Sequence, residues 1–181
     1  MNNPQEEHIM STELAWKIQY AAFAAAGGLY DERHAKLYAD LARDLIEDGS
    51  FSIVYKDVAH ACYTPMTIDE APHLKAYVLA PLAVLPEHQR KGYATRLMEE
   101  AEKQLNADAI FVCGEPFHYG RRYNTPHRIG FPVKTEAPIE CWFAKALTPG
   151  CLDGIVSTST ITGPYSTDQI WQHPNDQFPP R

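Results

Sequence analysis

Apolar residues recur three or four positions apart in two stretches near the start of the chain, which is the spacing of a helix with one buried face. The first stretch has Leu14, Ile18, Ala22 and Ala25 at this spacing. The second has Leu37, Leu41 and Leu45. Gly27-Gly28 ends the first stretch, Asp31 is an N-cap residue type ahead of the second, and Asp48-Gly49 stops it. The pattern predicts two helices.

Short runs of β-branched, aromatic or continuous apolar residues follow and predict strands. They lie at 51–55, 58–63, 74–85, 109–113 and 141–147. The first two flank Lys56-Asp57 and indicate a hairpin, and run 74–85 is typical of a strand buried on both faces. A loop is expected between runs 58–63 and 74–85, and it holds Pro65, Asp69, Glu70, Pro72 and His73.

Helical spacing returns after Gly92, with Ala94, Leu97, Met98, Ala101 and Leu105 on one face. This helix lies between the apolar strands 74–85 and 109–113, so the three elements form a β-α-β unit. A short helix can open at Pro116. Because the early hairpin adds antiparallel strands, the expected fold is α/β with a mixed sheet.

The chain carries no internal repeat or linker before Gly150, and its composition then shifts to Ser, Thr, Gly and Pro. We expect the main domain to cover 1–154, and a Ser/Thr/Pro-rich extension, 155–181, to be irregular.

Composition and charge exclude several classes of protein. The chain has 181 residues, 45% hydrophobic and 22% charged, which is ordinary for one globular domain. Its 16 Lys and Arg against 23 Asp and Glu give a net charge of −7, opposite to the field that nonspecific nucleic-acid binding needs. No apolar run approaches the roughly 20 residues that span a bilayer. Since residues 1–10 also lack a signal-peptide core, we expect no membrane association and a cytoplasmic location.

The cysteines and histidines do not predict a metal site. Cys62, Cys113, Cys141 and Cys151 show no C-x-x-C spacing and no histidine partners at zinc-finger distances. We therefore expect no metal.

Pro81 lies within the apolar strand 74–85, where its missing N–H cannot join a ladder. We interpret it as a β-bulge at Ala80–Leu82, which leaves neighbouring backbone groups for an extended ligand containing amides. The alternative is that two strands meet at Pro81.

The segment after this strand, Gln89-Arg-Lys-Gly-Tyr-Ala94, has the features of an anion site. Gly92 and Ala94 allow close backbone approach, and the first N–H groups of the following helix lie at its positive end. Arg90 and Lys91 add charge. Such a turn suits a pyrophosphate, although it is neither a P-loop nor a Rossmann turn.

With these residues the sequence resembles the GNAT superfamily of N-acetyltransferases, in particular its YhbS-like branch. L-A-V-L-P-E-H-Q-R-K-G-Y-A-T-R-L-M (82–98) is similar to the acetyl-CoA signature of the superfamily. G-E-P-F-H-Y-G-R (114–121), G-F (130–131) and A-K-A-L-T-P-G-C-L-D-G (144–154) are similar to motifs of the branch. The resemblance implies a mixed, mostly antiparallel sheet flanked by helices, with a bulged central strand.

Two departures from the family accompany these matches. The family opens with a strand before its first helix, for which the sequence offers only His8–Met10. The family also has almost nothing where this chain has the eight residues RYNTPHRI (122–129) between Arg121 and Gly130. This insertion is expected next to the acceptor pocket, where it can reshape or cover it.

The implied function is transfer of an acetyl group from acetyl-CoA, the co-substrate, to a primary amine by direct attack in a ternary complex. The backbone of Leu82, Ala83 and Val84 would pair with the pantetheine arm. The residues that would wrap the pyrophosphate are Gln89, Arg90, Lys91, Gly92, Tyr93, Ala94 and Thr95. A backbone N–H aimed at the thioester carbonyl would stabilise the charge that develops there.

The departing thiolate benefits from a proton donor, and the family motif places a tyrosine at Tyr119. Tyr123 is the second candidate for this general acid, because the insertion leaves the alignment open. If the gap falls before His127, the family position falls on Pro126 and the assignment fails. The alternative to a catalytic role is that Tyr119 is simply a packed aromatic residue.

The sequence does not decide the general base, the role of the basic residues, the acyl group or the acceptor. Glu70, His73 and Glu115 are candidate bases for the amine. Arg121, Arg122, Arg128, His118 and His127 form a local basic cluster that fits a CoA phosphate or an acidic acceptor, or is a solvated face. Alternatives to catalysis with acetyl-CoA are a non-catalytic acetyl-CoA-binding module, as a sensor or docking protein, and use of a longer acyl group. The net charge favours a cationic small-molecule or peptide amine as acceptor, and a homodimer is compatible with the resemblance.

Overall fold

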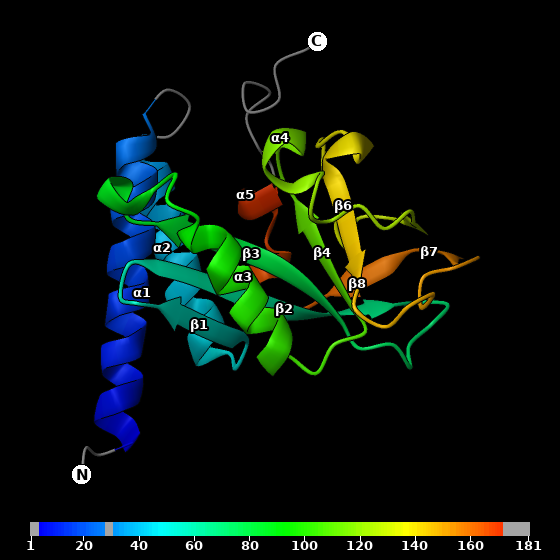
Figure 1. Ribbon diagram of the computed structural model, residues 1–181, viewed down its shortest axis with the longest axis horizontal. Helices are drawn as coiled ribbons and strands as arrows, with labels where there is room; N and C mark the ends of the chain where they lie inside the picture. The colour runs from blue at the N-terminus through cyan, green and yellow to red at the C-terminus, as the bar shows by residue number, and fades with distance from the viewer. Residues whose placement is uncertain (1–3, 28–30, 172–181) are drawn as a thin grey trace. The chain divides into compact units, whose positions relative to one another are not determined.

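The structure is a computed structural model that describes residues 4–27 and 31–171 (Figure 1). The chain divides into two compact units. The first comprises Met1–Cys62 and Ala80–Gln104, and the second comprises Tyr63–Leu79 and Leu105–Arg181. Strands β2 (Ala59–Ile68) and β3 (Ala76–Val84) each contribute one part to each unit.

Two packed helices open the first unit, α1 (Pro4–Ala26) and α2 (Glu32–Glu47). Ile18 and Ala22 of α1 are buried against Ala83 of β3, as expected for the core face of an amphipathic helix. Asp31 caps α2 by accepting a hydrogen bond from the backbone N–H of His34 (3.1 Å). Both predicted helices are confirmed, while Gly28 lies outside the described residues.

The strand expected at His8–Met10 is wrong. These residues lie inside α1, which begins at Pro4. Proline is favoured in the first turn of a helix because its fixed φ suits that turn and its missing N–H would have no partner there.

The predicted hairpin is confirmed in the first unit. β1 (Phe51–Tyr55) and β2 are joined by Lys56 (φ 52°) and Asp57 (φ 57°), both left-handed as a type I′ turn requires. β3 passes through Pro81 as one strand with a cis Ala80–Pro81 peptide bond, so the alternative of two strands meeting there is wrong. The bulge at Ala80–Leu82 stays a prediction.

After β3 the first unit continues with a 3₁₀ turn, η1 (Pro86–His88), and helix α3 (Tyr93–Gln104). α3 buries Leu97, Met98 and Ala101, the face that the apolar spacing predicts, and it contacts β1. The helix expected from Gly92 is therefore confirmed.

The second unit contains the remaining elements of the chain. They are β4 (Ala109–Cys113), α4 (Pro116–Tyr119), β5 (Arg128–Ile129), η2 (Ile139–Cys141), β6 (Trp142–Ala146), β7 (Val156–Ser157), β8 (Ser159–Ile161), η3 (Pro164–Ser166) and α5 (Asp168–Trp171). Figure 1 shows α4 directly after the end of β4.

The sheet has the strand order β1-β2-β3-β4-β6, with β8 paired to β2. β3 and β4 are parallel, with Ala76 opposite Ala109. β4 pairs with β6, and β2 with β8, in antiparallel fashion. β5 and β7 form a separate parallel pair. The expected α/β fold with a mixed, mostly antiparallel sheet and flanking helices is confirmed.

Two local expectations in the second unit are corrected. Pro65 lies within β2 rather than in the loop, because β2 continues to Ile68 and pairs with β8. Irregular structure after residue 154 is wrong for residues 156–171, which include β7, β8, η3 and α5. Residues 172–181 of the expected extension lie outside the described residues.

Trp171 explains why the last described residues are ordered. It is 1% exposed and its ring contacts those of Phe131, Trp142 and Tyr165. Its indole N–H donates to the carbonyl oxygen of Tyr165 (2.6 Å). Burial of so large a side chain offsets the entropy of ordering this segment.

Among the described residues, no helix has the length and apolar character needed to cross a membrane.

Candidate functional site

The turn between β3 and α3 is held by two side chains of its own. The side-chain amide of Gln89 donates to the carbonyl oxygen of Val84 (3.1 Å), and the ammonium of Lys91 donates to that of Glu87 (2.7 Å). Gln89 thus joins the turn to the end of β3, and Lys91 closes the 3₁₀ turn. Both contacts give the turn a defined shape before any ligand arrives.

The backbone of this turn leads into α3 and leaves the first N–H groups of the helix accessible. Arg90 (φ 57°) and Gly92 (φ 79°) both adopt left-handed conformations, which reverse the chain into the helix. The first helical bond runs from the N–H of Arg96 to the carbonyl of Gly92 (3.1 Å). The N–H groups of residues 92–95 therefore have no partner within α3, and they lie at its positive dipole end.

The charges around these N–H groups favour an anion. Arg90, Lys91 and Arg96 are exposed, and a Cβ built on Gly92 would meet no atom within 4 Å. Backbone donors, a helix dipole and cationic side chains together form the kind of site that binds phosphate groups.

Most of the remaining residues predicted for this site have side chains that pack in the protein, whereas Thr95 is exposed. Ala83 and Val84 are buried, and Leu82 is half-buried. Tyr93 packs against Tyr55 and against the edge of His88. Their backbone groups, rather than their side chains, are what this corner offers a ligand. The structure brings Leu82–Val84 and Gln89–Thr95 together at one corner of the first unit.

Tyr119 lies in the second unit, at the last position of α4. Its ring lies against Gly114, where a Cβ would be only 2.4 Å from Cε2 and 2.6 Å from Cδ2 of the ring. The glycine of the G-E-P segment thus makes room for Tyr119. The side chain is half-buried.

Tyr123, the second candidate for the acid, is fully buried. Its ring lies 6.1 Å from that of Tyr119 in an edge-on arrangement, and its N–H donates to the Tyr119 carbonyl (2.9 Å). A buried hydroxyl is harder for a substrate to reach, so the geometry favours Tyr119.

The candidate bases lie in two places in the second unit. Glu115 precedes α4, and its carboxylate is 3.8 Å from Nε2 of His118. Glu70 and His73 are exposed in the connection between β2 and β3, and the N–H of Glu70 donates to Oγ of Ser157 (2.9 Å). Sequence reasoning missed His118 as a partner of Glu115, although the E-x-x-H spacing on a helix was the available signal.

The insertion is fastened to β6. The N–H of Thr125 donates to the carbonyl of Ala144 (2.9 Å), and the N–H of Ala146 donates to Oγ1 of Thr125 (2.9 Å). Nδ1 of His127 accepts from the N–H of Ile129 (3.2 Å), so Nε2 carries the proton toward the carbonyl of Trp142 (3.3 Å). Burial lowers the pKa of His127, which agrees with a neutral ring.

These contacts divide the basic cluster that the sequence suggests. His127 is committed to the backbone, whereas Arg121, Arg128 and His118 are exposed. His127 therefore offers a ligand no free ring nitrogen as part of this cluster.

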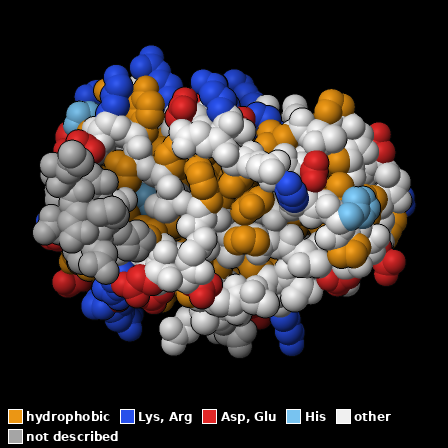
Figure 2. All heavy atoms as spheres, turned by 90° about the horizontal axis from the view of Figure 1, so that it is seen from below, with side chains coloured by type: hydrophobic (Ala, Val, Ile, Leu, Met, Phe, Trp, Pro, Cys, Tyr) orange, Lys and Arg blue, Asp and Glu red, His pale blue; other side chains and the backbone are white. Residues whose placement is uncertain are grey.

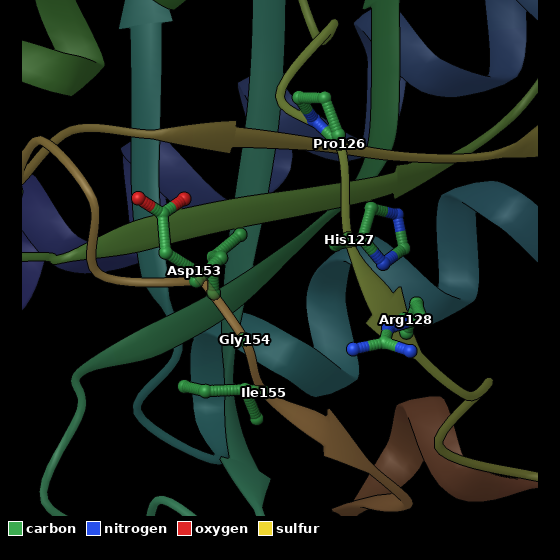
Figure 3. A pocket seen from close by; sticks show the side chains of 7 residues that line it. Pro126, His127, Arg128, Asp153, Gly154 and Ile155 are labelled. Carbon is green, nitrogen blue, oxygen red and sulfur yellow. The ribbon is translucent and has the colours of Figure 1, made fainter.

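The insertion forms one wall of a surface pocket of about 380 Å³. Its lining residues are Pro126, His127, Arg128, Leu152, Asp153, Gly154 and Ile155. Figure 3 shows Arg128 extending toward the Gly154–Ile155 segment, while the Asp153 carboxylate points away from it. The insertion thus forms this pocket together with residues 152–155.

Burial raises the pKa of the half-buried Cys113, at the end of β4, to about 12. Its thiol is therefore protonated at neutral pH. Within residues 4–27 and 31–171, no group of three or more His, Cys, Asp or Glu side chains is arranged to hold a metal ion.

Comparison with known proteins gives consistent matches. Residues 13–116 match the profile described as the acetyltransferase (GNAT) family. YjhQ of Escherichia coli K12, an uncharacterized N-acetyltransferase, is 32% identical over 127 residues, which cover 61% of this chain and 70% of YjhQ.

Two solved structures share the fold. YhbS of Escherichia coli, in complex with CoA, matches with a TM-score of 0.69 and 19% identity, over 84% of this chain and 85% of YhbS. A GNAT acetyltransferase of Brucella melitensis, in complex with acetyl-CoA, matches with a TM-score of 0.63 and 18% identity, over 91% of this chain and 94% of that protein.

Proposed function

Because the chain belongs to the acetyltransferase (GNAT) family, we propose that it transfers an acetyl group from acetyl-CoA to a primary amine by direct attack in a ternary complex. Two proteins that share its fold bind CoA and acetyl-CoA. The observation that carries the proposal is the corner between β3 and α3, where a braced turn presents the free N–H groups of a helix start.

In the proposed complex each part of the corner has its own role. The N–H groups of residues 92–95, with Arg90 and Lys91, bind the pyrophosphate. The backbone of Leu82, Ala83 and Val84 pairs with the pantetheine arm. Since Gln89 and Lys91 already hold the turn by hydrogen bonds to backbone carbonyls, little ordering is left for the binding step.

Direct attack fits the groups around the end of β4. The protonated thiol of Cys113 is a poor nucleophile, which argues against an acyl-enzyme intermediate at this residue. In the proposed step, the hydroxyl of Tyr119 gives its proton to the departing thiolate. Holding both substrates in one site supplies much of the remaining acceleration through orientation.

The proposed acceptor is cationic. The net charge of −7 attracts polyamines, aminoglycosides or lysine-rich peptides over long distances. Figure 2 shows Lys and Arg side chains as well as Asp and Glu on the same face, so the attraction comes from the sum of the charges. If this proposal holds, raising the ionic strength slows turnover, whereas best activity with neutral or acidic amines would overturn it.

Calorimetry with acetyl-CoA, followed by a thiol-release assay with spermine, kanamycin and poly-L-lysine, tests the proposed function. We expect binding in the micromolar range and CoA release that depends on an amine. Binding without release for any amine would indicate the non-catalytic module. Absence of binding to CoA and acetyl-CoA would overturn the proposal altogether.

A further inference from the structure

The proposed reaction needs a group that takes a proton from the amine, since an ammonium ion has no lone pair for attack. Three histidines of the second unit lie among its described residues: His73, His118 and His127. His127 uses both ring nitrogens on the backbone of Ile129 and Trp142, which leaves neither for a substrate.

His73 lies at the wrong end of β4. Hydrogen bonds between Lys75 and Asp108 fasten the β2–β3 connection, which contains Glu70 and His73, to the start of β4. Tyr119 follows the other end of this strand, about 13 Å away at the usual rise per residue. Glu70 and His73 are therefore poorly placed to act with Tyr119.

His118 meets both requirements of position and access. It lies on α4 beside Tyr119, with ring centroids 6.5 Å apart, and its side chain is 65% exposed. Glu115, one turn earlier, holds its carboxylate 3.8 Å from Nε2 of the imidazole. This distance is longer than a hydrogen bond, as is common for catalytic groups before the substrate is bound.

On this basis, we infer that His118 is the base that deprotonates the acceptor amine, and that Glu115 is a positioning residue that stabilises the imidazolium. The inference rests on the proposed acetyl transfer and adds the proton acceptor to it. It places the acid and the base of the reaction on one turn of α4, within the segment 115–119.

His118 takes one proton from the ammonium, and the free lone pair of nitrogen forms a bond to the thioester carbonyl carbon. The carbon–sulfur bond then breaks, and Tyr119 gives its proton to the sulfur. The second amine proton restores Tyr119 through solvent, and His118 releases its proton to bulk water. The products are the acetamide, CoA with its thiol protonated, and one proton.

The experiment measures CoA release with the most active of spermine, kanamycin and poly-L-lysine, in wild type, His118→Ala, Glu115→Gln and the control His73→Ala. We expect His118→Ala to lose about 100-fold in kcat, the lower end of what a general base contributes. Glu115→Gln should lose about tenfold, and His73→Ala should keep wild-type activity. Added imidazole should restore part of the loss in His118→Ala alone, which a merely structural role would not produce.

The outcomes separate this inference from the proposed function. If wild type releases CoA and His118→Ala does so equally fast, or if imidazole restores nothing, the inference is overturned while acetyl transfer stands. If wild type binds no acetyl-CoA or acts on none of the three amines, the proposed function and the inference fall together. Because the side chains of His118 and Glu115 are both exposed, we expect the variants to fold, and calorimetry with acetyl-CoA checks this.

Discussion

Gly114 and Tyr119 are complementary in shape: the tyrosine ring occupies the space in which any larger residue at 114 would place its Cβ. The contact closes the short turn between β4 and α4 and fixes the ring beside the end of the strand. The position of the proposed acid therefore depends on a residue that has no side chain.

Gly114→Ala tests this relationship. A Cβ at 2.4 Å from Cε2 of Tyr119 must displace the ring, so we expect CoA release to fall at least tenfold. Overpacking of this kind also destabilises proteins by about 1–3 kcal/mol. Gly130→Ala is the matched control, since its Cβ would meet only the Ser157 carbonyl at 3.8 Å. Equal activity in both variants would contradict the role given to Gly114.

Replacing the proposed acid itself should act on kcat. We expect Tyr119→Phe to lower kcat about 100-fold at neutral pH and to leave the KM for acetyl-CoA nearly unchanged, because the hydroxyl acts only as the thiolate departs. Tyr123→Phe is the comparison variant. If Tyr123→Phe proves the slower enzyme, the assignment moves to Tyr123.

Gly92→Ala should weaken acetyl-CoA binding. Its φ of 79° is unfavourable for alanine, so the turn must shift or bear strain of about 1 kcal/mol. Gly49→Ala carries the same conformational cost at φ 86°, beyond the end of α2. We expect calorimetry to show an increase in Kd of about tenfold for Gly92→Ala and none for Gly49→Ala, and a similar loss of stability in both. Unchanged binding in Gly92→Ala would contradict the assignment of this turn.

Trp171→Ala should be among the most destabilising single substitutions. Removing a side chain that is 1% exposed leaves a large cavity among Phe131, Trp142 and Tyr165, at a cost of about 3–5 kcal/mol in the free energy of unfolding. Phe117→Ala, at a position 86% exposed, should change it by less than about 0.5 kcal/mol. Urea denaturation measures both, and similar midpoints would show that the last described helix is dispensable.

Stability should fall with acidification because of His60. The ring is fully buried between the Gln19 amide (2.9 Å) and Oγ of Ser52 (3.0 Å), and burial lowers its pKa to about 4 from 6.5. Below about pH 6.5 the unfolded chain therefore takes up a proton that the folded protein does not.

The contribution of His60 to the free energy of unfolding is thus complete above pH 6.5. It is lost as the pH falls toward 4, where the free energy of unfolding is lower by about 3 kcal/mol. Denaturation of wild type and His60→Gln at several pH values measures it. We expect the free energy of unfolding to fall less steeply between pH 6.5 and 4 in the variant than in wild type. Parallel plots of this free energy against pH would contradict the prediction.

The helices and most strands of this chain follow from local patterns. The apolar stripe Leu37, Leu41 and Leu45 predicts α2, and Lys56-Asp57 predicts the turn of the hairpin. Each signal lies within a few residues of the structure that it specifies, so single-sequence reasoning finds it.

The end of the second unit could not be found in this way. β8 is three residues long and has no period-2 pattern of hydrophobic residues. It is held by Asp69, whose carboxylate accepts hydrogen bonds from the hydroxyls of Thr158 (2.5 Å) and Thr160 (3.1 Å). These partners are about 90 residues apart in sequence. Only the tertiary structure brings them together.

The candidate site was predictable to different degrees. The corner from Leu82 to Thr95 is one continuous segment, so its turn and the start of α3 could be predicted from sequence. The bracing bonds of Gln89 and Lys91, the clash-free fit of Tyr119 on Gly114 and the commitment of His127 to the backbone depend on side-chain positions, which no spacing rule specifies.

The attachment of Thr125 and His127 to β6 has a kinetic consequence. A segment whose main chain and side chains are both hydrogen-bonded to a strand does not swing like an active-site flap. A cycle of the proposed reaction would then need no slow opening of residues 122–129, the kind of step that limits many lidded enzymes. Substrates should then enter and leave at the rate at which they diffuse past a fixed wall, with no added step for the opening of this segment.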